Sequence, residues 1–177
     1  MSIQTFNMTE MARQAKIASR EVAQLNTTQK NNLLLAMAAA IEANKTQIIA
    51  ENSLDIIAGE QKGLSSAMLD RLKLDEERVS GIANAIREIV SLADPVGHMA
   101  DLSLRPNGIQ VGKMRIPLGV VSMIYEARPN VTAESAALCI KSGNAVVLRG
   151  GSEAIHSNLA LAKCLHSVLS EFVLNPN

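Results

Sequence analysis

The sequence has very few aromatic residues: no tryptophan, one tyrosine and two phenylalanines among 177 residues. A hydrophobic core therefore has to consist of leucine, isoleucine, valine, methionine and alanine, and we interpret the eight methionines as adaptable core residues. The chain contains no internal repeat and no low-complexity tract. Its length fits one ordinary domain.

An excess of either charge sign is also absent, since 17 basic residues balance 17 acidic ones. Neither nucleic acid nor a membrane surface is therefore expected as a partner. No apolar run approaches the roughly 20 residues that cross a bilayer, and the N-terminus lacks an apolar signal region. The only two cysteines are expected as free thiols in a reducing compartment, which predicts a cytoplasmic protein.

Residues that usually bind metals or act as nucleophiles are scarce. His98, His156 and His166 have no metal-ligand spacing with cysteines or carboxylates, so no metal site is expected. Cys139 and Cys164 lie beside apolar residues in expected helices without a neighbouring base. We interpret both cysteines as core residues rather than as nucleophiles.

Residues 1–95 are expected to form helices only, because apolar residues recur there at helical spacing. The expected helices cover residues 5–25, a stretch capped by Thr27 or Thr28, residues 45–58 before the breakers Gly59 and Gly63, residues 66–72, and a stretch from the cap Asp75 to Asp94 and Pro95. Several charged residues in this half are interpreted as a solvated face: Asp70, Arg71, Asp75, Glu76, Glu77 and Arg78. No catalytic motif is expected among these helices.

Residues 102–116 are predicted to form a β-hairpin. They contain Arg105-Pro106-Asn107-Gly108 between two short runs, and Asn-Gly is a strong hairpin signal because both residues tolerate a positive φ. A bare hairpin is marginally stable alone. Two alternatives remain: an arm that assembles subunits, or a surface hairpin packed on its own domain.

Residues 117–172 are predicted to contain a parallel βαβ unit followed by a helix over about 152–172. The strands are the β-branched run that ends at Ile124 and the run 145–148, and Thr132 and Gly143 are the candidate cap and stop of the helix between them. The fold class is therefore α/β. A nucleotide-binding parallel sheet usually has more than two strands, so we expect the N-terminal part of a larger fold.

Two stretches resemble the aldehyde dehydrogenase superfamily and, within it, the γ-glutamyl phosphate reductase family: PLGVVSMIYEARPNVT (117–132) and KSGNAVVLRGGSEA (141–154). GLSSAMLDRL (63–72) and LADPVG (92–97) agree with that resemblance. YEARPN and LRGG indicate the reductases, because ordinary aldehyde dehydrogenases have tryptophan-asparagine at the first site and lysine at the second. The family's nucleophilic cysteine lies well downstream, so the resemblance implies a chain that lacks the catalytic domain and is inactive alone.

The resemblance implies NADPH-dependent reduction of L-glutamyl 5-phosphate to L-glutamate 5-semialdehyde, a step of proline biosynthesis. It also implies a homo-oligomer in which the hairpin 102–116 assembles subunits. Two alternatives remain. One is another aldehyde or acyl-phosphate dehydrogenase, and the other is a non-catalytic module that binds nucleotide or assembles with a partner.

The loop after the first predicted strand holds the first candidate site, because ligands bind at the carboxyl ends of strands in open α/β sheets. The resemblance implies that Asn130 donates a hydrogen bond to the oxyanion of the reacting carbonyl. From its position alone, an asparagine after proline is most simply a turn residue. Arg128 is expected either to bind the phosphate or carboxylate of the substrate or to pair with Glu126. Tyr125 is expected to pack nearby with its hydroxyl bonded locally.

The second candidate site is Arg149-Gly150-Gly151-Ser152-Glu153, after the second predicted strand. Glycines allow close approach of a ligand to the backbone, and the N-terminus of the following helix favours anions. The superfamily places a lysine and a nearby serine or glutamate here against the adenosine ribose, so the resemblance implies an NADP(H) site. Arginine replaces that lysine and the acid comes one residue later, which leaves either Ser152 or Glu153 for the ribose.

Overall fold

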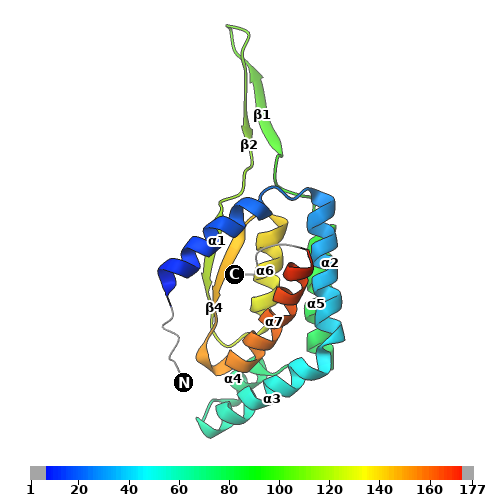
Figure 1. Ribbon diagram of the computed structural model, residues 1–177, viewed down its shortest axis with the longest axis vertical. Helices are drawn as coiled ribbons and strands as arrows, with labels where there is room; N and C mark the ends of the chain where they lie inside the picture. The colour runs from blue at the N-terminus through cyan, green and yellow to red at the C-terminus, as the bar shows by residue number, and fades with distance from the viewer. Residues whose placement is uncertain (1–6, 173–177) are drawn as a thin grey trace.

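The computed structural model describes residues 7–172, which form a helical body with a long β-hairpin projecting from one end (Figure 1). The elements in chain order are α1 (Met8–Val22), α2 (Thr27–Ala43), α3 (Lys45–Gln61), α4 (Ser66–Leu72), α5 (Glu76–Ser91), β1 (Met99–Leu104), β2 (Gln110–Met114), β3 (Val120–Ile124), α6 (Asn130–Lys141), β4 (Ala145–Arg149), the 3₁₀ turn η1 (Ser152–Ala154) and α7 (Ile155–Glu171). The predicted α/β class is confirmed. Residues 5 and 6 of the first expected helix lie outside the described residues.

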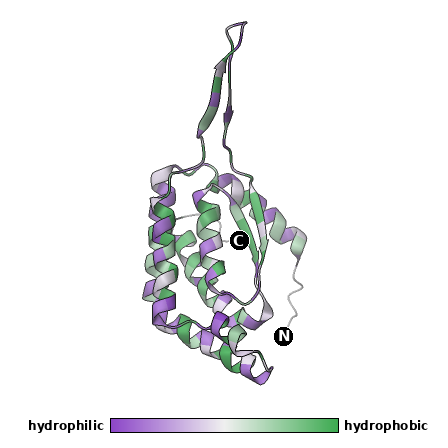
Figure 2. Cartoon of the chain, turned by 180° about the vertical axis from the view of Figure 1, so that it is seen from behind, coloured by the Kyte–Doolittle hydropathy of each residue, from purple (hydrophilic) through white to green (hydrophobic). Residues whose placement is uncertain are grey.

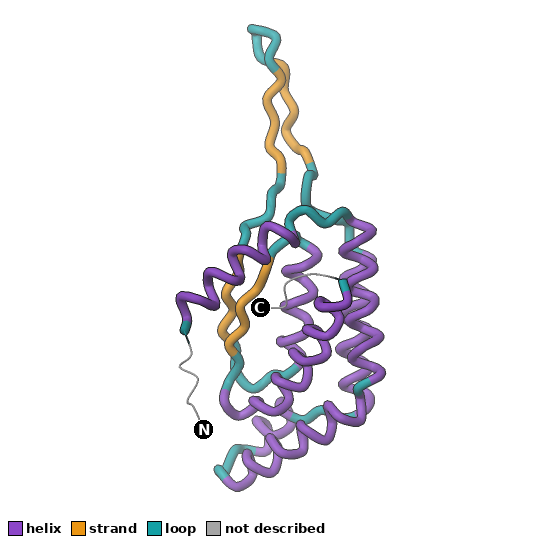
Figure 3. Tube along the Cα trace, in the orientation of Figure 1, coloured by secondary structure: helices purple, strands orange, loops and turns teal. Residues whose placement is uncertain are grey.

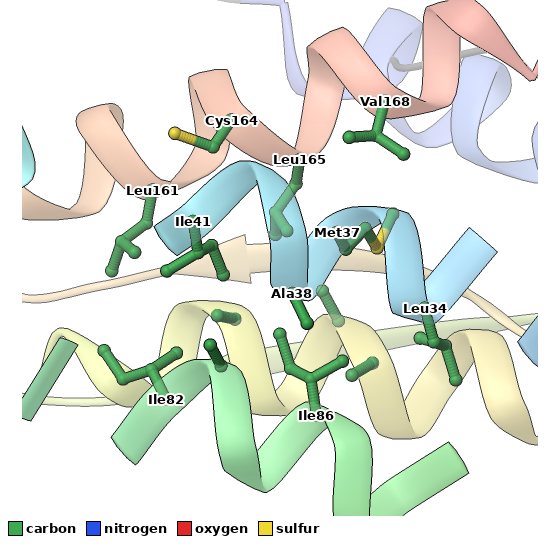
Figure 4. Packing of buried hydrophobic residues seen from close by; sticks show 14 of the residues in the cluster. Leu34, Met37, Ala38, Ile41, Ile82, Ile86, Leu161, Cys164, Leu165 and Val168 are labelled. Carbon is green, nitrogen blue, oxygen red and sulfur yellow. The ribbon is translucent and has the colours of Figure 1, made fainter. Parts of the chain in front are cut away.

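The core is built around α2, which lies between α7 on one side and α5 and α6 on the other (Figure 4). Its central side chains are almost fully buried: Leu34, Met37, Ala38 and Ile41. Those that meet them come from α5 and α7: Ile82, Ile86, Leu161, Leu165 and Val168. The described part of this core contains no aromatic side chain, as the composition predicted. Between residues 7 and 172, no single helix is long and apolar enough to cross a membrane; α2 and α3 pass that test only as a pair bent by 67°.

Two details of the first helices differ from the sequence prediction. Asn26, rather than a threonine at 27 or 28, caps α2: Asn26 Oδ1 accepts the N–H of Gln29 and Gln29 Oε1 accepts the N–H of Asn26, both at 2.9 Å. Gly59 does not break α3, because it is buried inside the helix where leucine side chains pack directly on its backbone. The helix ends near Gly63, whose φ of 73° favours glycine.

α5 begins as predicted. Asp75 Oδ1 accepts the backbone N–H of Arg78 at 2.9 Å and so caps the helix. The helix ends at Ser91, a few residues before the expected stop at Asp94 and Pro95.

The hairpin of β1 and β2 stands away from the body (Figure 3), so it does not pack on its own domain. Every residue of its strands except Ala100 is exposed. The turn differs from the expected Asn-Gly pair, because only Gly108 has a positive φ, of 82°. Its N–H donates to the carbonyl of Arg105 at 2.9 Å, so the turn spans Arg105 to Gly108.

The parallel βαβ unit is present as predicted. β3 pairs with β4 from Val120–Ala145 to Ile124–Arg149, with α6 between them in sequence, and Figure 2 shows both strands in the colour of hydrophobic residues. Gly143 ends the helix with a φ of 75°, and a Cβ there would stand 2.8 Å from Pro117 Cγ. The carboxyl ends of both strands lie at the end of the body opposite the hairpin, near α4 (Figure 1). Both candidate loops therefore lie at that end.

Candidate functional site

The loop after β3 alternates between buried and exposed residues. Ala127 and Pro129 are buried, whereas Glu126 and Arg128 are exposed. The N–H of Val131 donates to the carbonyl of Arg128 at 3.1 Å, which leads the chain directly into α6. The buried residues thus anchor the loop and leave the arginine side chain at the surface.

Arg128 and Asn130 line a pocket of about 360 Å³ between this loop, α4, α5 and α6. The other lining residues come mainly from the N-terminal half: Asp70, Arg71, Lys73, Leu74, Arg78, Gly81, Ile82, Pro129 and Glu134. Four basic and two acidic side chains give the lining a formal net charge of +2. This charge favours an anionic ligand.

Asn130 is the first residue of α6 and is half-buried. Its Nδ2 donates to Glu134 Oε1, one turn further along the helix, at 3.1 Å. An asparagine amide carries two N–H donors, so this bond leaves one donor for a ligand in the pocket. The carboxylate also orients the amide.

Arg128 forms no ion pair with Glu126, so the structure does not contain the alternative expected for it. Their contact is between backbones, where the N–H of Arg128 donates to the carbonyl of Glu126 at 2.7 Å. No carboxylate in residues 7–172 lies within ion-pair distance of the Arg128 guanidinium. The guanidinium is therefore available to a ligand.

Arg71 was interpreted as part of a solvated face; it is exposed, as expected, but it also lines this pocket, which the sequence interpretation did not include. Asp70 and Arg78 do form an exposed ion pair there, at 2.8 Å. The tertiary fold nevertheless brings this helix end to the loop of Arg128 and Asn130. The one available signal was the resemblance of residues 63–72, which include Arg71.

Behind the second loop, a chain of side-chain hydrogen bonds joins the loop after β3, α6 and α7. Thr132 Oγ1 donates to Asn158 Oδ1 at 2.9 Å and lies 2.6 Å from the hydroxyl of Tyr125, which therefore donates to it. Burial raises the pKa of Tyr125 and keeps this donor protonated. Thr132 is thus buried inside α6 rather than being its cap, since the helix begins at Asn130. The predicted local bond of Tyr125 is present.

Side chains lie close to both glycines of the second loop. A Cβ at Gly150 would overlap Asn158 Nδ2, and one at Gly151 would overlap the Glu153 carboxylate, which folds back over its own loop. The two glycines have no side chains, and next to them the Arg149 guanidinium and the Ser152 hydroxyl are exposed.

The N-terminus of α7, which was expected to favour a ligand anion, already holds a carboxylate. Asp55 of α3 is 2% exposed; its Oδ1 accepts the N–H of His156 at 3.1 Å, and its Oδ2 accepts the N–H and the hydroxyl of Ser157 at 2.8 and 2.6 Å. These bonds satisfy donors that the helix leaves open. A ligand anion at this loop would therefore have to bind Arg149 rather than the N-terminus of α7.

Both cysteines are buried, as predicted for core residues. Burial raises the pKa of Cys139 and that of Cys164, which disfavours the nucleophilic thiolate. In the part of the chain that the structure describes, no group of three or more histidine, cysteine, aspartate or glutamate side chains is placed to hold a metal ion.

Comparison with known proteins shows extensive similarity. The aldehyde dehydrogenase family matches residues 2–175. Gamma-glutamyl phosphate reductase of Colwellia psychrerythraea is 69% identical over 165 residues, which are 93% of this chain and 40% of that protein. The reductase of Geobacter metallireducens is 62% identical over 154 residues, 87% of this chain and 36% of that one. The chain thus spans about 40% of the length of the first of these curated relatives.

Solved structures agree with the sequence comparison. Gamma-glutamyl phosphate reductase of Thermotoga maritima superimposes with a TM-score of 0.89 at 32% identity, over 92% of this chain and 39% of that one. The reductase of Saccharomyces cerevisiae gives 0.88 at 29% identity, over 92% and 42%. A salicylaldehyde dehydrogenase of Pseudomonas putida gives 0.70 at 20% identity, over 90% and 31%, and shows a common fold.

Proposed function

Because this chain belongs to the aldehyde dehydrogenase family, we propose that it is the cofactor-binding part of an NADPH-dependent γ-glutamyl phosphate reductase. The observation that carries this proposal is the 69% identity to the Colwellia psychrerythraea reductase over 93% of the chain. Members of the family act on small-molecule substrates with NAD(P). The proposed reaction converts L-glutamyl 5-phosphate into L-glutamate 5-semialdehyde and phosphate, a step of proline biosynthesis.

In the proposed reaction, a cysteine thiolate displaces phosphate from the substrate, and NADPH supplies the hydride that reduces the resulting thioester. Cys139 and Cys164 are buried, so neither supplies this thiolate. In the proposed reaction, a cysteine from a part of the protein outside this chain supplies it. Asn130 stabilises the negative charge that develops on the reacting carbonyl oxygen. Arg128 binds the phosphate, because a guanidinium pairs with phosphate oxygens through two parallel hydrogen bonds.

The proposed organisation has three parts. Residues 1–95 form the helical part, residues 102–116 an assembly hairpin, and residues 117–172 the nucleotide-binding unit. In that unit, Arg149, Gly150, Gly151, Ser152 and Glu153 surround the adenosine end of the cofactor. The exposed Arg149 pairs with the additional ribose phosphate of NADPH, and the exposed Ser152 faces the ribose. Glu153 lies back on Gly151, which supports Ser152 in that role.

The cofactor proposal is tested together with the activity in a full-length reductase that carries residues 1–177. We expect oxidation of glutamate 5-semialdehyde to require inorganic phosphate, since phosphate releases the acyl group from the thiol, and to favour NADP⁺ over NAD⁺. Arg149→Ala should lower that preference about ten- to a hundredfold, the range of one charge-assisted hydrogen bond. The measurement is kcat/KM for each cofactor.

Two control variants sharpen this experiment. Arg149→Lys keeps the charge without the planar fork and should lose only part of the preference. Arg20→Ala removes an exposed arginine from α1 and should change nothing. Turnover independent of phosphate would contradict the reductase, whereas equal losses with both cofactors would place Arg149 on a shared part of the nucleotide.

We also propose that the protein forms a homo-oligomer through the hairpin 102–116. The hairpin projects from the body and exposes large apolar side chains: Leu102 by 61%, Leu104 by 71%, Ile109 by 57% and Met114 by 58%. Apolar surface of this kind marks interaction sites, and an isolated hairpin has little stability of its own. Partner subunits supply the missing packing in this proposal.

The combined substitution Leu102→Ser and Leu104→Ser is expected to lower the oligomer mass without loss of helix, because it removes apolar contact area only from the hairpin. Light scattering measures the mass and circular dichroism the helix content. Leu54→Ser, at a 47% exposed position on α3, serves as the matched control and should change neither. An unchanged mass in the double variant would remove the hairpin from the interface.

A further inference from the structure

The pocket that holds Arg128 and Asn130 contains a second available guanidinium, that of Arg71 in the last turn of α4. No carboxylate in the described residues lies within ion-pair distance of it. The other basic side chains of the α4–α5 wall already have acidic partners: Arg78 with Asp70 at 2.8 Å and Lys73 with Asp75 at 3.7 Å. Arg71 is therefore the cation that this wall of the pocket offers to a ligand.

The backbone around Arg71 is held in place by side chains from other elements. Three carbonyl groups next to it accept such bonds: those of Asp70 and Lys73 from Arg78 Nη1, and that of Leu72 from Asn52 Nδ2 at 2.8 Å. Asn52 is itself 2% exposed and also binds Ser157 Oγ at 2.9 Å. A helix of seven residues is thus fixed at the end that carries Arg71, as a preorganised binding site requires.

The substrate of the proposed reaction has two anionic groups, a phosphate on the reacting carbonyl and an α-carboxylate at the other end. Arg128 lies in the loop after β3 and Asn130 opens the helix that follows, so together they take the carbonyl and its phosphate. Arg71 reaches the pocket from α4, on a different wall. We propose that Arg71 binds the α-carboxylate and so makes the enzyme specific for an amino-acid substrate. This inference rests on the proposed function.

The test compares two aldehydes in the phosphate-dependent oxidation by a full-length reductase that carries residues 1–177. Glutamate 5-semialdehyde has the α-carboxylate, and butyraldehyde lacks it. Arg71→Ala should lower kcat/KM for the semialdehyde about ten- to a hundredfold, mainly through KM, because one charge-assisted interaction is lost. The kcat/KM for butyraldehyde should stay at its value in the unmodified enzyme. The preference for the semialdehyde over butyraldehyde should therefore fall by the same factor.

Three further variants separate recognition from folding. Arg71→Lys should retain part of the preference, because the charge remains without the fork. Arg128→Ala should raise the KM of phosphate with both aldehydes, and Arg20→Ala should change neither value. Arg71 does not bind the α-carboxylate if Arg71→Ala lowers kcat/KM equally for both aldehydes, or if the variant keeps the full preference for the semialdehyde. The proposed function itself fails if the unmodified enzyme shows no dependence on phosphate and no preference for the semialdehyde.

Discussion

Replacing Asn130 with alanine in a full-length reductase that carries residues 1–177 should lower kcat by about 10²–10³-fold, the usual loss for one oxyanion donor. The KM of the aldehyde should change much less, because the negative charge that Asn130 stabilises in the proposed reaction exists only in the transition state and the tetrahedral intermediate. Steady-state kinetics measure both values. Deuterium at the aldehyde carbon shows whether hydride transfer limits the rate under the same conditions.

The contact between Asn130 and Glu134 supplies the controls for this prediction. In the unmodified chain, Asn130 Nδ2 lies 3.1 Å from Glu134 Oε1. Glu134→Gln keeps an acceptor oxygen for this amide and should change kcat far less than Asn130→Ala does. Asn130→Asp replaces the donor with an acceptor of the same shape and should be as inactive as the alanine variant. An unchanged kcat in Asn130→Ala, with hydride transfer limiting, would leave Asn130 as no more than the first residue of α6.

The βαβ unit was predictable because its signals are local. A β-branched run, a helical apolar face and Gly143 follow one another within about thirty residues, which is the usual length of such a unit. Details that depend on competition between neighbours were not predictable. Asn26 rather than Thr27 caps α2, because only Asn26 is placed to exchange two hydrogen bonds with Gln29. Thr132 has a typical capping side chain, yet its hydroxyl is used inside the fold.

From the sequence, candidate site residues could be proposed only where they closely follow a strand. Arg149 ends β4, and Arg128 and Asn130 come shortly after β3, on the edge where a parallel sheet usually binds ligands. Asp55 was not predictable, because the helix end that it occupies is 102 residues further along the chain. Arg71 is exposed, as a residue of a solvated face should be, and only the tertiary fold places it at the same pocket as Arg128.

Two buried lysines were equally invisible in the sequence, because lysine is almost never fully buried without a partner. Lys30 on α2 is 2% exposed and Lys141 at the end of α6 is 3% exposed. Asp94 pairs with Lys30, at 2.7 Å from its Nζ. Lys141 Nζ donates hydrogen bonds to the neutral side chain of Asn31 and to the carbonyl of Val90. Burial lowers the pKa of Lys141, and Asp94 partly opposes that shift.

Asp94→Asn is therefore expected to lower the free energy of unfolding of this chain by about 3–5 kcal/mol, the usual loss when one partner of a buried ion pair is removed. The substitution leaves the ammonium of Lys30 buried without a counter-charge. Urea unfolding followed by circular dichroism measures the change. Lys30→Met combined with Asp94→Asn should recover much of the loss, because it removes the stranded charge.

The matched control is Asp101→Asn, which removes the carboxylate of an exposed pair, with Lys113 at 3.4 Å. Side chains that are 85% and 69% exposed contribute little, so the urea midpoint should not move. A loss in Asp101→Asn equal to that in Asp94→Asn, or no loss in either, would contradict the role of burial.

The same pair predicts how stability depends on pH. Burial alone would raise the pKa of Asp94, but hydrogen bonds from Lys30, the N–H of Val96 and Thr27 outweigh burial and lower it. A carboxyl group whose pKa is lower in the folded chain stabilises it above the unfolded pKa, near 4, and that contribution disappears as the pH falls through the folded value. When the pH is lowered below about 4, the urea concentration at the unfolding midpoint should therefore decrease for the unmodified chain. It should decrease less for Asp94→Asn. Equal falls in both would assign the acid sensitivity to other carboxylates.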